Sequence, residues 1–274
     1  MISLKLKNRT VTTEDPAFVM AIVNATPDSF WKESRGGIEL ALKAIEEGAH
    51  ILDLGAESTR PGSQYVSEEE EIKRLIPLLK EIRRHSHIPV SIDTRKAGVF
   101  KACLEEGADI LNDVSALEDD EKMAGLCARE EVPVILMHKR NTPDKMQLNT
   151  EYKDVFSEVE NYLYSRIDYA LKHGISSDKI ILDPGIGFGK NAQDNCTLIK
   201  KCGLLCGKKY PVLMALSRKT VIGALTGREV EDRLAGTLAA DLLAVQSGAF
   251  MVRVHDVKET VDSLKVLKGI SEAR

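Results

Sequence analysis

The stretch FVMAIVNATPDSF, residues 18–30, joins an apolar run to a polar segment. Residues 18–23 are apolar without interruption, as expected for a strand that is buried on both faces of a parallel sheet. The chain then reaches the amide of Asn24 and a proline turn, where a hairpin would use Asn-Gly or Asp-Gly. A doubly wound open sheet often has a glycine-rich phosphate-binding turn after its first strand, and this segment has none. The stretch therefore favours a closed barrel over an open sheet.

Seven further apolar runs follow, and segments with helical periodicity separate them. The eight runs begin at Phe18, His50, Pro89, Ala108, Pro133, Lys179, Pro211 and Ala249. Eight strand–helix units with parallel strands predict an α/β fold of the (β/α)8 TIM barrel type, with a doubly wound sheet as the alternative. No composition shift marks a second domain, so we expect residues 1–274 to form a single barrel domain. The first 17 residues are expected to form a short strand or hairpin that closes the barrel bottom.

Helix boundaries are visible in the segments between these runs. Ser67 and Glu70 have the spacing of a capping box, which predicts that a helix begins there. We expect the acidic run Glu68–Glu71 to be a solvated helix start. The periodic segment 151–174 ends on Gly174, which predicts a helix stop.

Composition and charge exclude several classes of function. The net charge of −4 implies no basic face, so nucleic acid is not an expected partner. No apolar run approaches the length of a membrane span, and the N-terminus has charges where a signal peptide would be apolar. Cys196, Cys202 and Cys206 are too widely spaced for common zinc sites, and no His lies among them. We therefore expect a cytoplasmic protein with free thiols.

Polar side chains follow the carboxyl ends of all eight runs, where the catalytic groups of a barrel lie. They are Asn24, Asp53, Glu57, Asp93, Asn112, Asp113, His138, Asp183, Ser217, Arg218, Lys219, Arg253 and His255. A single Asp at a strand end can equally cap the next helix, but eight polar ends predict a ring of hydrogen-bonding groups around one mouth. The glycine spacing of GIGFGK, residues 185–190, does not match a Walker A motif, so we interpret it as a turn that brings Phe188 to this mouth.

The ring separates into two kinds of group. Asp93, Asn112 and Asp183 offer carboxylates and an amide, which suit a flat heterocycle bearing N–H and amino groups and a carbonyl. The cationic groups are Arg60, Lys219, Arg253 and, when protonated, His255. Arg253 and His255 lie on one face of the last strand by the period of two, and we expect Asp256 to cap the following helix. The sequence predicts a heterocycle site with an anion site beside it.

Seven motifs occur in an order that resembles the dihydropteroate synthase family. They are NATPDSF, LGAESTRPGS, SIDTRK, LNDVSA, LDPGIGFGK, SRKTVIG and RVHDV, and they cover the chain from the first to the last strand. The resemblance implies a (β/α)8 barrel and the condensation of 7,8-dihydropterin-6-ylmethyl diphosphate with 4-aminobenzoate, which forms 7,8-dihydropteroate and pyrophosphate in folate biosynthesis. It also implies a homodimer. The alternatives are a non-catalytic pterin-binding relative and a pterin-dependent methyltransferase.

The resemblance also implies a role for individual residues. By similarity, the pterin would contact Asp93, Asn112, Met137, Asp183, Phe188 and Lys219. The diphosphate would be held by Asn24, Thr59, Arg60, Arg253 and His255, with Mg2+ assisting and Asn24 near the metal. The 4-aminobenzoate site would comprise Phe30, Thr59, Arg60, Pro61, Phe188, Ser217 and Lys219. The residues implied to act in catalysis are Asp93, Asp183, Lys219, Arg253 and His255.

Three segments depart from the family pattern. Residues 31–35 are longer and more charged than the family's usual Ser-Asp-Gly-Gly continuation, and Lys32 stands where an acid is common. Lys139 and Arg140 follow the fifth strand where the family tends to be less charged. Ala215-Leu216 precedes the SRK motif where a glycine is common. If the acid missing at position 32 helps to hold the metal-diphosphate, then Glu33 or Asp28 substitutes for it or Lys32 contacts the phosphate; the alternative is that this loop is variable and solvated.

Overall fold

The computed structural model of the protein describes residues 1–25, 36–57, 65–140 and 151–273. An eight-stranded parallel sheet forms the centre, in the order β8-β7-β6-β5-β4-β3-β10-β9. Its strands are β3 (Phe18–Asn24), β4 (Ile51–Gly55), β5 (Val90–Asp93), β6 (Ile110–Asp113), β7 (Val134–Met137), β8 (Ile180–Asp183), β9 (Leu213–Met214) and β10 (Met251–Val254). A parallel bridge between Leu182 and Val212 joins β8 to the start of β9 and closes the ring. The predicted barrel and its eight strands are confirmed.

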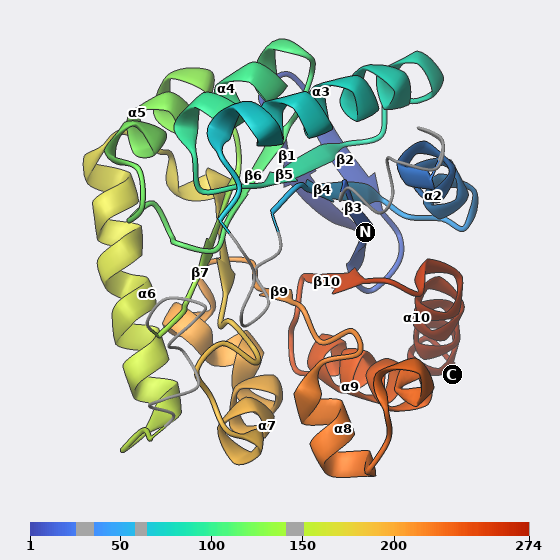
Figure 1. The fold of residues 1–274 in the computed structure, drawn as a ribbon. Coiled ribbons are helices and arrows are strands. Elements are labelled where there is room, and N and C mark those ends of the chain that lie inside the picture. The colour runs from blue at the N-terminus through green and yellow to red at the C-terminus, as the bar shows by residue number, and fades with distance from the viewer. Residues whose placement is uncertain (26–35, 58–64, 141–150, 274) are drawn as a thin grey trace.

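Helices cover the outside of this ring of strands (Figure 1). They are α2 (Gly36–Glu46), α3 (Glu68–His85), α4 (Ala97–Glu105), α5 (Glu121–Glu130), α6 (Val155–Lys172), α7 (Ala192–Lys201), α8 (Thr220–Thr226), α9 (Leu234–Gln246) and α10 (Val257–Ser271). Short 3-10 helices are η1 (Ser177–Lys179), η2 (Cys202–Lys208) and η3 (Val230–Asp232). Within the described part of the chain, no helix combines the length and apolar character that a membrane span requires.

The strands divide their side chains between two separate apolar clusters. Alternate residues such as Phe18, Ile51 and Ile181 pack in the barrel interior. Their immediate neighbours, such as Val19 and Leu52, pack outward against the helices. The period of two along a strand therefore determines which polar residue faces the interior at each strand end.

A two-stranded antiparallel hairpin closes the N-terminal end of the barrel, as predicted. It consists of β1 (Ile2–Lys5) and β2 (Thr10–Thr13). Leu4 and Leu6 are buried in the interior cluster, at 4% and 1% exposure. Lys179 donates hydrogen bonds from Nζ to the carbonyls of Lys5 (3.1 Å) and Leu6 (2.9 Å). The interior is thus sealed by apolar residues at the bottom and left polar at the mouth.

Two predicted helix boundaries are confirmed, and one expectation about α3 is wrong. Ser67 Oγ accepts a hydrogen bond from the amide of Glu70 at 3.3 Å, and α6 ends just before Gly174, whose φ is +91°. Glu71 is not part of a solvated helix start, because it is fully buried. It lies one turn before Leu75 on the face of α3 that packs against the barrel. Its carboxylate pairs with Lys96 at 3.2 Å.

Candidate active site

The inward-facing residues at the carboxyl ends of the strands meet at one mouth of the barrel. Asp93 of β5 lies in register with Asn112 of β6, and Met137 of β7 lies in register with Asp183 of β8. All four side chains are buried, with exposures of 9% or less. The structure therefore brings the predicted pterin residues of these four strands together.

Arg253 of β10 lies at the centre of this group. Its Nε donates to Asp53 Oδ2 at 2.6 Å, and its Nη2 donates to Asp93 Oδ2 at 2.9 Å. Asn112 Nδ2 also donates to Asp53 Oδ2, at 3.1 Å. Burial opposes the charge of Arg253, but the two carboxylates outweigh burial and raise its pKa. Arg253 therefore remains a cation between two acids.

The sequence shows Asp53 as a polar strand end, but the family resemblance does not implicate it in ligand binding. It is fully buried, and its partners come from β6 and β10. The signal for it was present, because Asp53 shares the inward parity of Ile51 in β4. Asp113 has the opposite parity, and its carboxylate accepts hydrogen bonds from the amides of Ser115 and Leu117. Asp113 therefore shapes the turn after β6.

The protonation of Asp93 is set by opposing effects. Burial raises its pKa, Arg253 lowers it, and the carboxylates of Asp53, Glu71 and Asp113 raise it further. The resulting pKa is about 7. Asp93 therefore exchanges its proton close to neutral pH, in direct contact with Arg253.

Lys219 lies beside Asp183 and the turn after β8. Its Nζ donates to the carbonyl of Ile186 and lies 5.0 Å from the centre of the Phe188 ring. Burial lowers the pKa of Lys219 to about 8, although Asp183 opposes the shift. Burial also raises the pKa of Asp183, against the effect of Lys219. The prediction that the 185–190 turn carries Phe188 to the mouth agrees with this contact.

Gly185 and Lys190 give this turn its shape. Gly185 has a φ of +68°, and a Cβ there would lie 1.8 Å from the carbonyl oxygen of His138, so no other residue fits. Its amide donates to Asp183 Oδ1 at 2.7 Å. Lys190, which had no expected role, is 4% exposed and donates to the carbonyls of Gly185 (2.8 Å) and Phe188 (3.0 Å). These bonds position the turn from beneath.

Ser217 and His255 form a second unit at the mouth. Ser217 Oγ accepts from the backbone amide of His255 at 3.2 Å and lies 3.0 Å from Nδ1 of its ring. A hydroxyl can both donate and accept, so Ser217 can hold Nδ1 of the His255 ring in either tautomer. His255 is exposed at the mouth.

Asp256 does not cap α10 with its side chain, contrary to expectation. Its carboxylate instead binds Arg218 through two bonds, from Nε at 2.9 Å and from Nη2 at 2.7 Å. A bidentate guanidinium–carboxylate pair is a stronger interaction than a single side-chain cap. The pair joins the loops after β9 and β10.

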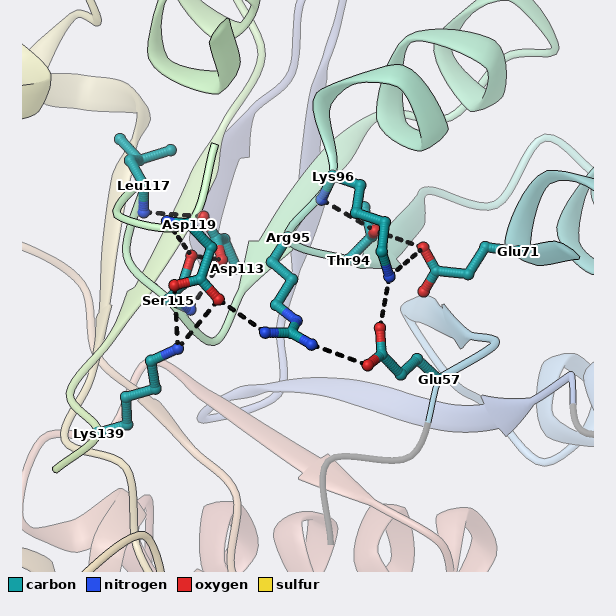
Figure 2. Close-up of polar contacts among 10 residues, drawn as sticks. All are labelled: Glu57, Glu71, Thr94, Arg95, Lys96, Asp113, Ser115, Leu117, Asp119 and Lys139. Atoms are coloured by element: carbon teal, nitrogen blue, oxygen red, sulfur yellow. Dashed lines mark hydrogen bonds and ion pairs between the residues drawn. The ribbon is translucent and has the colours of Figure 1, made fainter. Parts of the chain in front are cut away.

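An ion-pair chain crosses the loops after β4, β5, β6 and β7 (Figure 2). In order, its members are Lys139, Asp119, Arg95, Glu57, Lys96 and Glu71, with successive N–O distances of 3.3, 2.9, 2.9, 2.5 and 3.2 Å. Lys96 also lies 4.6 Å from the centre of the Tyr65 ring. We call this set the rim chain. Lys139, one of the departures from the family pattern, is therefore part of a network that ties four loops together.

Comparisons with known proteins agree with this geometry. A model of the pterin binding enzyme family matches residues 20–255. The protein is 39% identical over 272 residues to a dihydropteroate synthase of Bacillus subtilis, covering 96% of this chain and 92% of the relative. It is 43% identical over 268 residues to that of Neisseria meningitidis serogroup C, covering 93% of each chain. The chain belongs to the dihydropteroate synthase family.

Solved structures of this synthase family have the same fold. A Xanthomonas albilineans dihydropteroate synthase with 4-aminobenzoic acid aligns with a TM-score of 0.91 at 41% identity, covering 99% of both chains. The same organism's enzyme in complex with 7,8-dihydropteroate aligns with a TM-score of 0.88 at 38% identity, also covering 99% of both chains. The protein is accordingly a transferase of folate biosynthesis.

Some residues that the synthase family resemblance implicates lie outside the described residues. They are Phe30, Thr59, Arg60 and Pro61, and the divergent segment 31–35 lies there too. Asn24 is described, and it lies exposed at the end of β3. Within the described ranges there is no group of three or more His, Cys, Asp or Glu that could hold a metal ion. An amide oxygen at the mouth nevertheless fits Mg2+, which commonly takes one or two protein oxygens together with substrate phosphates and waters.

Proposed function

We propose that the protein joins 7,8-dihydropterin-6-ylmethyl diphosphate to 4-aminobenzoate, giving 7,8-dihydropteroate and pyrophosphate. The observation that carries this assignment is the inward-facing set of Asp93, Asn112 and Asp183 beside Lys219 and Arg253 at one end of the barrel. Acids and an amide suit the N–H and amino groups of a pterin, and the cations suit its diphosphate. The family membership and the ligands of the Xanthomonas albilineans structures support the same reaction.

The chemistry that these groups support is dissociative substitution. The bond between the methylene carbon and the diphosphate oxygen breaks first, and its electron pair leaves with pyrophosphate. The positive charge that remains on the pterin is stabilised by the carboxylates of Asp93 and Asp183, which lie in a buried environment where charge interactions are strong. The lone pair of the arylamine nitrogen then forms the new carbon–nitrogen bond, and that nitrogen releases its proton.

The departing anion would meet His255 and Arg253. Ser217 Oγ contacts both the backbone amide and Nδ1 of His255 and so holds its ring at the mouth. Arg253 keeps its charge at all working pH values, because Asp53 and Asp93 raise its pKa. When bound, Mg2+ would neutralise charge on the diphosphate, and Asn24 at the end of β3 would help to hold it. The amine needs no strong base before it attacks, so the remaining contribution of the protein is positioning and the exclusion of water.

The remaining parts of the proposal concern the state of the protein in the cell. Five free thiols support a reducing, cytoplasmic location. We also propose a single barrel domain over residues 1–274 and a homodimer. Exposed leucines on η2, α8 and α9 support an interface with a second copy; they are Leu204, Leu225 and Leu243, at 48%, 62% and 59% exposure. Light scattering of Leu225→Asp, which places a charge in this surface, tests the dimer, and an unchanged dimer mass would contradict that interface.

The decisive experiment measures pyrophosphate release from dihydropterin diphosphate, with and without 4-aminobenzoate and Mg2+. Release that depends on 4-aminobenzoate and yields dihydropteroate supports the synthase. Tight pterin binding without release would identify a non-catalytic pterin-binding relative instead. Asp183→Asn should abolish release. Asp109→Asn is the matched control, because Asp109 pairs with Arg83 at the opposite end of the barrel.

A further inference from the structure

Asp53 lies in the middle of β4, inside the barrel and one step below the polar mouth. Its neighbours in register are Ile22 of β3 and Ser91 of β5, and its side chain is 0% exposed. A carboxylate in such a position costs free energy unless donors compensate its charge. The residues that donate hydrogen bonds to Asp53 therefore indicate its role.

Two donors from distant strands converge on one oxygen of Asp53. Oδ2 accepts from Nε of Arg253 at 2.6 Å and from Nδ2 of Asn112 at 3.1 Å. These residues are separated from Asp53 by 200 and 59 positions in the chain. Both donors also belong to the set that meets at the mouth.

The contact with Asn112 determines how that amide faces a ligand. A carboxylate can only accept, so the NH2 end of the amide must point toward Asp53. The amide oxygen and the second amide hydrogen then remain for the ligand. Without Asp53, the amide could turn by half a rotation and exchange its donor and acceptor ends.

The contact with Arg253 determines the plane of the guanidinium. Because the guanidinium is planar, one bond from Nε to Asp53 and one from Nη2 to Asp93 fix its orientation. The hydrogens on Nη1 are directed away from both bonds by the same geometry. Arg253 forms ion pairs with both Asp53 and Asp93, so its positive charge is divided between two carboxylates.

We propose that Asp53 is a positioning residue, which fixes the amide of Asn112 and the plane of Arg253 and so sets the donors and acceptors offered to the pterin. This role rests on the proposed function, since it takes the ligand to be a pterin. Asp53 acts through its two partners.

The test measures the affinity for 6-hydroxymethyl-7,8-dihydropterin by calorimetry across a range of pH. Asp53→Asn keeps the size of the side chain but replaces an accepting oxygen with a donating NH2 group. We expect binding to weaken by about tenfold or more, as when a buried hydrogen-bond partner is removed. The Asp109→Asn variant should bind like the wild type.

The pH dependence of binding separates positioning from general damage. The charged groups around Asp93 are Arg253, Asp53, Glu71 and Asp113. Asp53→Asn removes one negative charge near Asp93 and leaves Arg253 paired with Asp93 only. Both changes favour the Asp93 anion, so the pH midpoint of binding should move to lower values. Weaker binding with an unchanged midpoint would overturn the proposal, as would wild-type affinity in Asp53→Asn.

A second variant keeps Asp53 intact. Asn112→Asp retains an oxygen for the ligand but replaces the amide donor to Asp53 with a second carboxyl group, which can donate only after it takes up a proton. We expect about a tenfold loss of affinity or more, and wild-type affinity would overturn the proposal. This variant decides the matter if Asp53→Asn does not fold. A wild-type protein that binds no pterin would overturn the proposed function together with this role, whereas normal binding by either variant overturns the role alone.

Discussion

Lys190 Nζ lies 2.9 Å from Nδ1 of His138, and both side chains are almost fully buried, at 4% and 6% exposure. Burial and the nearby charge of Lys190 lower the pKa of His138 to about 2, so the ring is neutral and its Nδ1 accepts. Burial lowers the pKa of Lys190 itself to about 7, and in its protonated form the three ammonium hydrogens are matched by three acceptors, which are this nitrogen and the carbonyls of Gly185 and Phe188. The pair supports the turn that carries Phe188 and the carbonyl bound by Lys219.

Lys190→Met should therefore weaken pterin binding and lower stability. The substitution keeps the length of the side chain but leaves three buried acceptors without their donor, which costs at least about 2 kcal/mol. We expect a lower midpoint in urea unfolding, together with a loss of pterin affinity. Lys200→Met, at an exposed position of α7, is the control and should change stability by less than about 0.5 kcal/mol. Equal effects of the two substitutions would contradict the role of Lys190.

Asp93 predicts a rise in activity with pH near neutrality. Its anion stabilises the pterin cation, and its pKa is about 7, because burial outweighs the effect of Arg253. The value of kcat/KM for the pterin substrate should therefore be low at pH 6, rise through about pH 7, and fall again as Lys219, whose pKa is about 8, loses its charge. Asp93→Asn should lose most activity and also the pH dependence around 7. If Asp93→Asn kept the same rise of kcat/KM with pH, the titrating group would be a residue other than Asp93.

The same shift predicts the pH dependence of stability. The folded pKa of about 7 is above the unfolded value of about 3.9, so the folded state binds the Asp93 proton more tightly. The stability that this proton contributes is complete below about pH 4 and is lost as pH rises through 7. The free energy of unfolding of the wild type, relative to that of Asp93→Asn, should fall between pH 4 and 8. Urea unfolding at several pH values measures this difference.

Asp241 of α9 is a carboxylic acid without a visible structural benefit. It is 2% exposed, and neither carboxylate oxygen has a hydrogen-bond partner among the described residues. Burial, with a further contribution from Asp256, raises its pKa well above the usual value. The wild type must therefore lose stability as pH rises from about 4 through this folded pKa. Asp241→Leu should be more stable by about 1 kcal/mol or more at pH 8, because a buried carboxyl group that has no hydrogen-bond partner among the described residues is replaced by an apolar side chain.

The matched control for Asp241→Leu is Asp262→Leu, at an exposed position of α10. It should change thermal stability little at any pH. If Asp241→Leu were less stable than the wild type at pH 8, Asp241 would have a compensating partner in solution.

Substitution of Arg95 tests how much the rim chain contributes to the free energy of unfolding. It pairs with Glu57 and Asp119, both at 2.9 Å, and its side chain is 25% exposed. Arg95→Ser should lower the free energy of unfolding by about 1 kcal/mol, less at high salt, as expected for partly screened pairs. Arg84→Ser removes a more exposed pair with Glu81 and should have almost no effect. Chemical denaturation at low and high salt compares the two, and equal losses would mean that the rim chain does not act as a network.

Much of the barrel could be predicted because its signals are local. Each strand is a short apolar run, and Ser67 and Gly174 mark helix ends within a few residues. The polar strand ends follow from the same pattern, since parallel strands place their carboxyl ends together. The motif order then identified the family.

The contacts of the site residues could not be predicted, because they depend on residues distant in sequence. Asp53 finds Arg253 200 positions away, and only the closed ring brings them together. In the sequence, Glu71 is one of four consecutive acids at a helix start. The orientation of α3 in the fold directs its side chain toward Lys96. Asp256 precedes a helix, yet Arg218 offers its carboxylate two bonds that the helix end does not.

The N-terminal hairpin has a consequence for how the chain folds during synthesis. Leu4 and Leu6 belong to the interior cluster that also contains Ile181, Leu213 and Met251, which are synthesised much later than the two leucines. The carbonyls of Lys5 and Leu6 accept hydrogen bonds from Lys179, which is also synthesised later. The two leucines therefore gain their full set of buried partners only after β10 has been synthesised, although the hairpin itself is made before the barrel strands. A nascent chain stalled before β8 should consequently expose this hairpin to proteases and chaperones.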